Sequence, residues 1–228
     1  EFFTHLRRIG RLKLRPTVFY ASQIVLIFQY LHSKGIIYRD LKPENLLLDR
    51  DGNLRMTDFG LAKRVETRTW TICGTPEYIA PEILLNTGHG KAVDWWTLGI
   101  LIYEMLCGIP PFVAEDTMGI GRQILAGDID FPPYVGKSSR NLISQLLQAN
   151  STKRLGNGKN GVEDVKNHPF FEGVKWTSCF NKESRPPFRP QVRGPTDTRN
   201  FIDYSDSDSD SDEEPPDCDP RDDPFKDF

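Results

Sequence analysis

YRDLKPEN, residues 38–45, places an Asp, a Lys and an Asn within six residues. DFG, residues 58–60, begins thirteen residues after that Asn, and APE follows at residues 80–82. Between the first two motifs, residues 46–48 and 54–56 are short β-type runs on either side of an Asp-Gly turn, which predicts a hairpin. Any one of these motifs is also typical of a solvated turn. Their order, and the hairpin that joins them, favour a single site built from all three.

A resemblance is carried by these motifs together with two further stretches. RTWTICGTPEY, residues 68–78, and AVDWW, residues 92–96, are similar to the catalytic subunits of cAMP-dependent protein kinases, which are AGC-type serine/threonine kinases. The first motifs follow the kinase catalytic-loop, DFG and APE pattern, with Tyr38 in the place of His. The resemblance covers essentially the whole chain and is weakest between residues 204 and 224. It implies a protein-kinase-like C-terminal lobe with a small β-hairpin and an extended C-terminal tail.

Helical patterns account for most of the remaining sequence. Apolar residues recur at helical spacing from residue 16 to residue 32, and residues 93–107 are apolar on nearly all sides, as in a buried helix. Shorter helices are expected at residues 117–126, 139–148 and 162–167. The predicted class is therefore mainly α, with the kinase C-terminal lobe at residues 1–171 and the AGC-type tail at residues 172–228.

The resemblance also indicates a part of the kinase fold that this sequence does not match. Similar kinases carry a β-rich N-terminal lobe, with a Gly-rich loop and a strand lysine, before the position of Glu1. We therefore expect the N-terminal β lobe to be absent and the sequence to be a fragment that begins within the kinase domain. The phosphate-covering half of the nucleotide site would then have no donor among these residues.

Charge is segregated along the chain. Residues 201–228 hold 12 acidic and 2 basic residues, a net −10, so a total of −3 leaves +7 for residues 1–200. Ser alternates with Asp from Ser205 to Asp212, a composition that cannot bury enough apolar surface to order itself. We expect disorder around residues 205–224. This tract departs from the resembled family, and we expect an acid-directed kinase to modify its serines.

The sequence argues against disulfides, a zinc site, a membrane span, nucleic-acid binding and a dinucleotide site. The four cysteines form no CxxC pair, which argues against a disulfide framework or a zinc site and favours a reducing compartment. We expect a cytoplasmic protein, with nuclear residence left open. No apolar run is long enough for a membrane span, and no basic run is dense enough to indicate nucleic-acid binding. GNGKNG, residues 156–161, matches a dinucleotide-binding pattern, but without a preceding β-run it is expected to be a surface loop.

The resemblance assigns chemical roles to residues of the first motifs. Phosphoryl transfer depends mainly on positioning and on neutralising charge. Asp40 is expected to accept or orient the proton of a substrate hydroxyl, and Lys42 to steady the transferred phosphate. Asn45 and Asp58 are expected to hold Mg²⁺, which prefers oxygen ligands. ATP is the implied phosphoryl donor, with contacts from Leu47, Thr57, Asp58 and Phe201.

Substrate recognition is implied by acidic residues that match the family's peptide groove. Carboxylates pair with guanidinium groups in a bidentate geometry, so these residues are expected to receive arginines that precede the target Ser or Thr. They are Glu1, Glu44, Glu77 and Glu104. An apolar pocket for the residue after the target is expected from Ile72, Pro76 and Ile79. For Glu104 an internal salt bridge remains the alternative, and Glu82 is expected to pair with Arg154.

Thr71 matches the activation-loop phosphorylation site of the resembled family. Arg39 and Lys63 are the expected ligands of its phosphate, through charge-assisted hydrogen bonds. Phosphate on Thr71 would then order residues 60–82 by joining them to the catalytic loop.

Two functions follow from the sequence. The leading hypothesis is an ATP-dependent serine/threonine protein kinase that transfers the γ-phosphate to Ser or Thr in Arg-containing motifs of protein substrates. The alternative is a catalytically silent binding module whose acidic residues capture Arg-rich partners, such as a regulatory subunit or a pseudosubstrate inhibitor. Phosphorylation of an Arg-containing peptide distinguishes the two.

Overall fold

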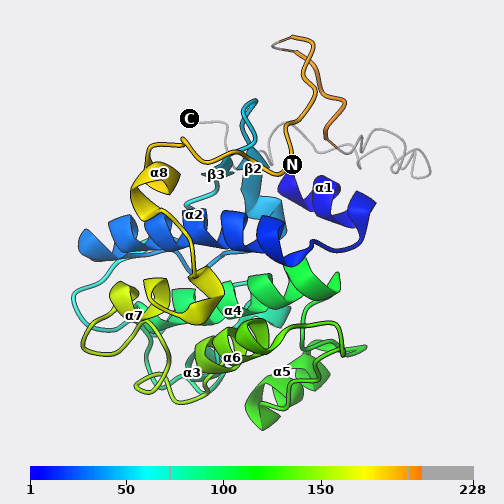
Figure 1. Ribbon diagram of the computed structural model, residues 1–228. Helices are drawn as coiled ribbons and strands as arrows, with labels where there is room; N and C mark the ends of the chain where they lie inside the picture. The colour runs from blue at the N-terminus through cyan, green and yellow to red at the C-terminus, as the bar shows by residue number, and fades with distance from the viewer. Residues whose placement is uncertain (72, 195, 202–228) are drawn as a thin grey trace, which may run out of the picture.

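Two long helices, α2 (Leu14–Ser33) and α4 (Ala92–Cys107), pack against each other and organise the chain. The computed structural model describes residues 1–71, 73–194 and 196–201. In Figure 1, α2 crosses the molecule above α4. Every residue of α4 from Ala92 to Leu106 is buried, and the helix ends at Gly108, whose positive φ of 88° suits a left-handed C-cap.

Four smaller helices surround this pair: α3 (Pro81–Leu84), α5 (Thr117–Ala126), α6 (Lys137–Leu146) and α7 (Val162–Lys166). Helix α6 packs on α4, α7 packs on α2, and α3 packs on α5. The close packing of α6 on α4 depends on Gly99, because a Cβ at this position would lie 2.8 Å from the Leu147 side chain and 2.9 Å from Leu146. A larger residue would push the two helices apart.

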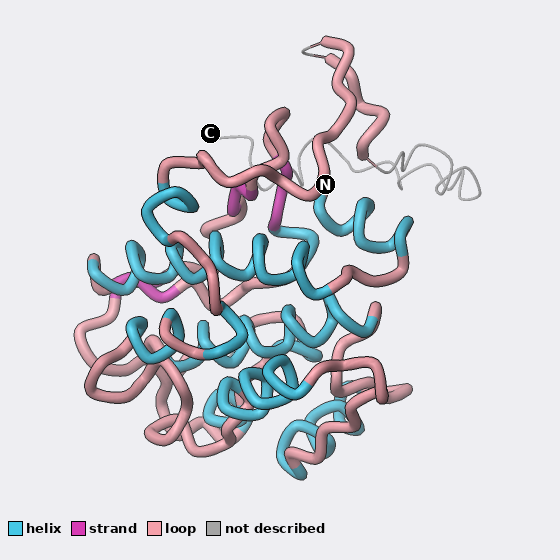
Figure 2. Tube along the Cα trace, viewed as in Figure 1, coloured by secondary structure: helices cyan, strands magenta, loops and turns pink. Residues whose placement is uncertain are grey.

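The strands form two separate antiparallel pairs, which Figure 2 shows among the helices. β2 (Leu46–Leu48) pairs with β3 (Leu54–Met56), with Leu47 opposite Arg55. β1 (Ile36–Ile37) pairs with β4 (Lys63–Arg64). The β2–β3 hairpin and helix α1 (Phe2–Ile9) lie together on the side of α2 away from α4.

Single turns of 3₁₀ helix and one short helix complete the elements. The turns are η1 (Pro43–Asn45), η2 (Pro76–Tyr78) and η3 (Pro169–Phe171), and the helix is α8 (Trp176–Phe180). After α8 the chain crosses the hairpin and α1. At the crossing, a Cβ on Gly52 would lie 2.0 Å from the Phe188 carbonyl oxygen, so only glycine fits this turn.

The mainly α prediction is confirmed, and most element bounds differ by one or two residues. The hairpin and the helix at 117–126 lie where the sequence predicted them. Helix α1, helix α8 and the β1–β4 pair were not predicted. The predicted disorder around residues 205–224 lies outside the described residues. No described helix has the length and apolar character needed to cross a bilayer.

Candidate active site

The backbone of Tyr38 and Arg39, just before Asp40, is held by one buried carboxylate, that of Asp94 in the first turn of α4. Asp94 is fully buried and accepts hydrogen bonds from the backbone N–H of Arg39 at 2.8 Å and of Tyr38 at 3.0 Å. Its Oδ2 also lies 2.7 Å from His32 Nε2 on α2. These bonds hold Arg39 at a φ of 70°, which a residue with a side chain rarely adopts. The fold thus fixes the direction in which Asp40 points.

Asp40 has both carboxylate oxygens engaged by polar side chains. Its Oδ2 accepts from Asn45 Nδ2 at 2.7 Å and lies 3.2 Å from Lys42 Nζ. Its Oδ1 accepts from Thr75 Oγ1 at 3.3 Å, and Lys42 Nζ in turn donates to Thr75 Oγ1 at 3.1 Å. The structure therefore brings the three predicted catalytic residues together, and it adds Thr75, for which no role was predicted.

Asn45 and Asp58 are joined through the residue between the hairpin and the DFG motif. Thr57 donates to the Asn45 carbonyl oxygen from its N–H at 3.0 Å and from its hydroxyl at 3.1 Å. Asp58 follows at a φ of 53°, is exposed, and accepts from the Gly60 N–H at 3.0 Å. Because Asn45 uses its Nδ2 on Asp40, its Oδ1 remains available as a ligand oxygen. One amide oxygen and one carboxylate fit Mg²⁺, which is often held by one or two protein groups plus phosphates and water.

Three of the four predicted peptide-binding acids share one electrostatic environment. Burial raises the pKa of Glu104. A hydrogen bond from Tyr78 and the positive charge of Arg7 lower this pKa, and the nearby charges of Glu44 and Glu77 raise it. Glu104 is 3% exposed, accepts from the Tyr78 hydroxyl, and lies 3.6 Å from Arg7 Nη2. The internal salt bridge considered as the alternative is therefore present, within a cluster that still carries three carboxylates.

Comparison of the sequence with known proteins identifies the family to which the chain belongs. The model of the protein kinase domain matches residues 1–171. The chain belongs to the protein kinase family. The kinase is 53% identical over 210 residues to the cAMP-dependent protein kinase catalytic subunit PRKX of Mus musculus and 51% identical over 211 residues to that of Homo sapiens. Each match covers 92% of this chain and 59% of the relative.

A third relative matches over the whole of this sequence. The cAMP-dependent protein kinase catalytic subunit of Dictyostelium discoideum is 50% identical over 231 residues, which cover 100% of this chain and 35% of that protein. The resemblance to cAMP-dependent catalytic subunits is thus confirmed. The chain spans about three fifths of the length of its PRKX relatives.

The activation segment of the kinase, residues 58–82, carries the predicted phosphorylation site. Thr71 is exposed, and neither predicted phosphate ligand contacts it. Arg39 Nε donates to the Leu61 carbonyl at 2.7 Å, and Lys63 Nζ donates to Thr69 Oγ1 at 2.8 Å. Both cations thus contact the same segment as Thr71, at Leu61 and at Thr69. The role of Thr71 stays a prediction.

The predicted apolar pocket is only partly described. Pro76 and Ile79 are half-buried and flank Tyr78, the residue that donates to Glu104. Ile72 lies outside the described residues. The pocket therefore also stays a prediction.

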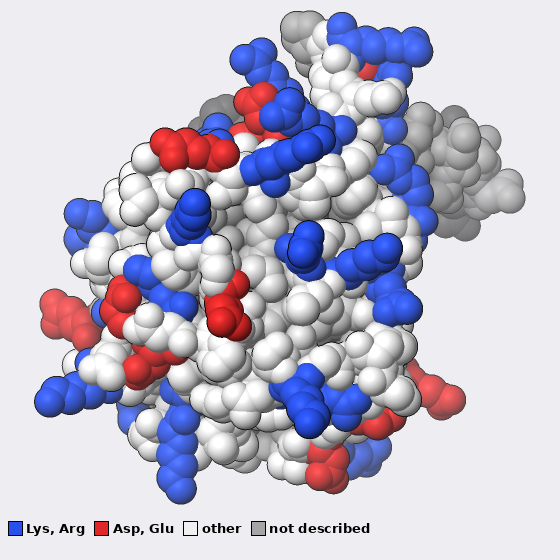
Figure 3. Space-filling view, viewed as in Figure 1, with Lys and Arg blue, Asp and Glu red and all other residues white. Residues whose placement is uncertain are grey.

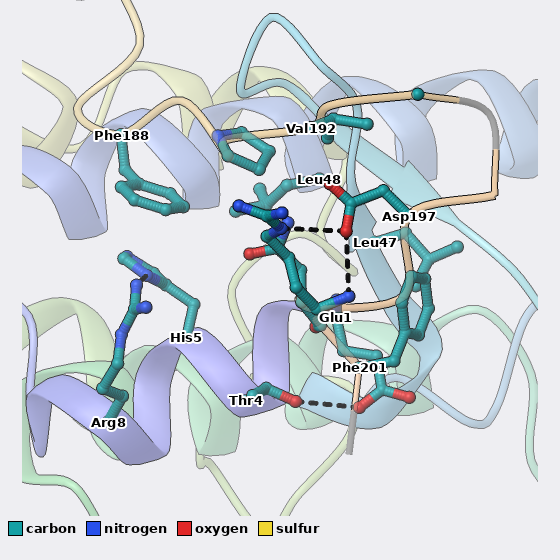
Figure 4. A pocket seen from close by; sticks show the side chains of 14 residues that line it. Glu1, Thr4, His5, Arg8, Leu47, Leu48, Phe188, Val192, Asp197 and Phe201 are labelled. Atoms are coloured by element: carbon teal, nitrogen blue, oxygen red, sulfur yellow. Dashed lines mark hydrogen bonds and ion pairs between the residues drawn. The ribbon is translucent and has the colours of Figure 1, made fainter. Parts of the chain in front are cut away.

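The remaining predicted residues line a separate pocket between α1, the hairpin and the tail, shown in Figure 4. This pocket of about 300 Å³ contains Glu1, Leu47 and Phe201. Glu1 accepts from the Thr4 hydroxyl at 2.9 Å. The structure thus places Glu1 beside two predicted nucleotide-binding residues, and no contact links it to the cluster around Glu104.

Glu82 of the APE motif forms a structural ion pair, as the sequence predicted. Arg154 is fully buried and donates to both Glu82 oxygens, at 2.6 Å from Nη1 and 2.8 Å from Nη2. Its Nη1 also donates to the Ala92 carbonyl at 2.9 Å. This pair ties the end of the activation segment to the start of α4.

Proposed function

We propose that this chain forms the catalytic and peptide-binding part of an ATP-dependent serine/threonine protein kinase that acts on residues preceded by arginine. The observation that carries the proposal is the fixed carboxylate of Asp40, held by Asn45, Lys42 and Thr75. A protein substrate binds beside this carboxylate with its hydroxyl facing it.

The roles that we propose for Asp40, Lys42 and Thr75 follow from the contacts among these three side chains. Its oxygens are within reach of a substrate hydroxyl proton, and general-base help of this kind contributes about 10²–10⁴ in rate. Lys42 lies 3.2 Å from Asp40 and carries a charge that offsets the negative charge of a transferred phosphate. Thr75 bonds to both and keeps them in register.

Protein kinases in general use ATP and Mg²⁺. Asn45 Oδ1 and the exposed carboxylate of Asp58 would hold the metal, which neutralises charge on the phosphates when it is bound. The hydrogen bonds of Thr57 to the Asn45 carbonyl keep these two ligands in neighbouring positions.

The acidic cluster of Glu44, Glu77 and Glu104 supports the preference for arginine. The charges of Glu44 and Glu77 raise the pKa of Glu104, so a guanidinium group that binds among the three carboxylates removes this repulsion as well as forming its own hydrogen bonds. Arg7 shows that the pocket at Glu104 already accepts one. The relatives are named catalytic subunits, and a regulatory subunit or pseudosubstrate inhibitor with an Arg-containing segment is a partner that fits this cluster.

Peptide selectivity tests the substrate class. Phosphorylation of Arg-Arg-Ala-Ser-Ile by the full chain should exceed that of Lys-Lys-Ala-Ser-Ile, because Lys cannot form bidentate pairs. Glu77→Gln should raise the KM for the Arg peptide and narrow the ratio between the two peptides. The control Glu172→Gln removes an exposed carboxylate elsewhere and should change neither.

Equal rates on both peptides, unchanged by Glu77→Gln, would overturn the proposed specificity. Tight binding of the Arg peptide without phosphorylation would instead support the silent binding module.

A further inference from the structure

Helix α1 and the start of α2 carry a concentrated positive charge that has few partners. We define the basic surface as Arg7, Arg8, Arg11, Lys13 and Arg15, all of which are exposed. No Asp or Glu occurs between Phe2 and Arg39. Among the described residues, only Arg7 of these five pairs with a carboxylate. Figure 3 shows Lys and Arg gathered over α1 and the loop that follows it.

The dipole of α2 strengthens this potential at the start of that helix, where Lys13 and Arg15 lie. Lys13 is the N-cap residue of α2, and the first turn of α2 contains no acidic residue. The N-terminus of a helix carries a partial positive charge, so anions stabilise it and cations do not. Lys13 and Arg15 therefore sit where the fold favours the opposite charge. An external carboxylate or phosphate would relieve this repulsion.

Arg8 and Arg11 contact rings rather than carboxylates. The Arg8 guanidinium lies 3.2 Å from His5 Nδ1 and 5.7 Å from the centre of the Phe188 ring. Arg11 stacks on Tyr134 at 3.9 Å from the ring centre. Both contacts hold the side chain in place and leave its charge unneutralised, so the surface is pre-organised for an anion.

A negatively charged segment of the same chain follows the last described residue, Phe201, which lies beside α1. We define the acidic tract as residues 203–214, which hold seven acids and no Lys or Arg. Phe201 lines the pocket at Glu1 and Thr4, and the Glu1 amino group donates to the Asn200 carbonyl at 3.2 Å. The described chain therefore ends at the N-terminal end of α1, and the tract begins two residues later in the sequence.

The distance can be covered by a short length of chain. The eight residues of α1 span about 12 Å at 1.5 Å per residue. Five extended residues cover about 16 Å, so the acids from residue 206 onward reach the far end of α1 and the loop after it. A tether of this length gives an effective concentration in the millimolar range, at which several individually weak ion pairs suffice.

We propose that the acidic tract binds the basic surface of its own chain. Binding holds the preceding residues, Asn200 and Phe201, in the pocket beside Glu1 and Leu47. This inference does not depend on phosphotransfer: none of the basic residues contacts Asp40, and only Arg7 contacts a residue of the peptide-binding cluster, Glu104.

Carbodiimide cross-linking of the full chain tests the contact, because the reagent joins a lysine amine to a carboxylate with which it is in contact. Lys13 should be linked to residues 203–214 in the monomer at about tenfold higher yield than the exposed Lys153 and Lys159, which lie between α6 and α7. About 1 M salt should abolish the difference, since the Debye length then falls to about 3 Å.

Matched variants show whether the Lys13 cross-link depends on the charge of the basic surface or only on correct folding. Arg11→Gln with Arg15→Gln should reduce the Lys13 cross-link at least about threefold, whereas Lys153→Gln with Lys159→Gln removes the same charge and should not. Asp206, Asp208, Asp210 and Asp212 changed together to Asn should give the same loss without altering any described residue. Equal yields at all three lysines, or Lys13 links found only between two chains, would overturn the proposal.

Discussion

Thr75 is the residue of the site that most clearly needs the structure to be recognised. It lies 35 positions from Asp40 in the sequence, yet its hydroxyl bonds to both Asp40 and Lys42. Asp94 is similar, since its bonds to the backbone of residues 38 and 39 join segments that no spacing rule connects. By contrast, Asp40, Lys42 and Asn45 could be predicted, because their motif is local.

Replacing Thr75 by Val keeps the shape of the side chain and removes its hydrogen bonds. Each lost bond costs about 0.5–1.5 kcal/mol of stability, so the two together should lower the unfolding free energy by about 1–3 kcal/mol. We expect kcat to fall about tenfold, because Asp40 and Lys42 lose the hydroxyl that positions both. Steady-state kinetics and urea denaturation measure the two effects. The control Thr177→Val, at an exposed hydroxyl, should leave kcat unchanged. A Thr75→Val enzyme with full activity would show that Thr75 has no positioning role.

Glu104 should make Arg-peptide binding sensitive to pH. Because burial raises the pKa of Glu104 above its ordinary value of 4.5, it becomes neutral at a higher pH than an exposed glutamate as the solution is acidified. The Kd of the Arg peptide should therefore begin to rise while the pH is still above 4.5. Glu104→Gln should bind more weakly at neutral pH and lose this part of the pH dependence. Fluorescence titration of a labelled peptide measures both, and identical pH profiles would contradict the assignment.

Among the elements, those with strong periodicity could be predicted and those made by long-range pairing could not. The apolar run of α4 and the Asp-Gly turn between β2 and β3 are local signals. The β1–β4 pair joins residues 36–37 to residues 63–64, and neither strand has a pattern of its own. Helix α1 buries only Phe2, His5 and Leu6, too few residues to show helical spacing in the sequence.

The link between α3 and α4 depends on the buried Glu82–Arg154 pair. Arg154→Lys keeps the charge but cannot donate to both carboxylate oxygens and to Ala92 together. Breaking a buried pair costs about 3–5 kcal/mol, and we expect the Lys variant to approach this loss of unfolding free energy in urea. Arg122→Lys, at an exposed site on α5, should change it by less than about 0.5 kcal/mol. Similar losses of unfolding free energy in the two variants would show that the Glu82–Arg154 pair contributes no more than an exposed arginine does.

Phosphorylation of Thr71 should act on the whole activation segment. A phosphate there adds acceptors to the segment that Lys63 and Arg39 already contact, at Thr69 and at Leu61. We expect the phosphorylated chain to resist protease cleavage within residues 60–82 and to phosphorylate peptide faster. Thr71→Ala should abolish both gains, while Thr67→Ala should keep them. Unchanged protection and activity in Thr71→Ala would show that this mechanism is wrong.

Taken as a whole, the molecule separates its charges by function. The carboxylate cluster at Glu44, Glu77 and Glu104 is the proposed binding site for cationic peptides. The basic surface includes α1, whose N-terminal end lies beside Asn200 and Phe201. Composition predicted the segregation along the chain, with +7 in residues 1–200 and −10 after them. It could not predict that the basic residues would lie near Asn200 and Phe201, because this depends on how residues 181–194 and 196–201 pack against α1.

Phosphotransfer by the full chain with Asp40 intact or changed to Asn tests the proposed function most directly. Asn keeps the size and the hydrogen-bonded position of Asp40 and removes its basicity. With ATP, Mg²⁺ and Arg-Arg-Ala-Ser-Ile, we predict phosphopeptide formation by the unaltered chain and a rate about 10²–10⁴ lower in Asp40→Asn. Equal rates in the two chains, with the peptide bound equally by both, would contradict the proposed catalytic role.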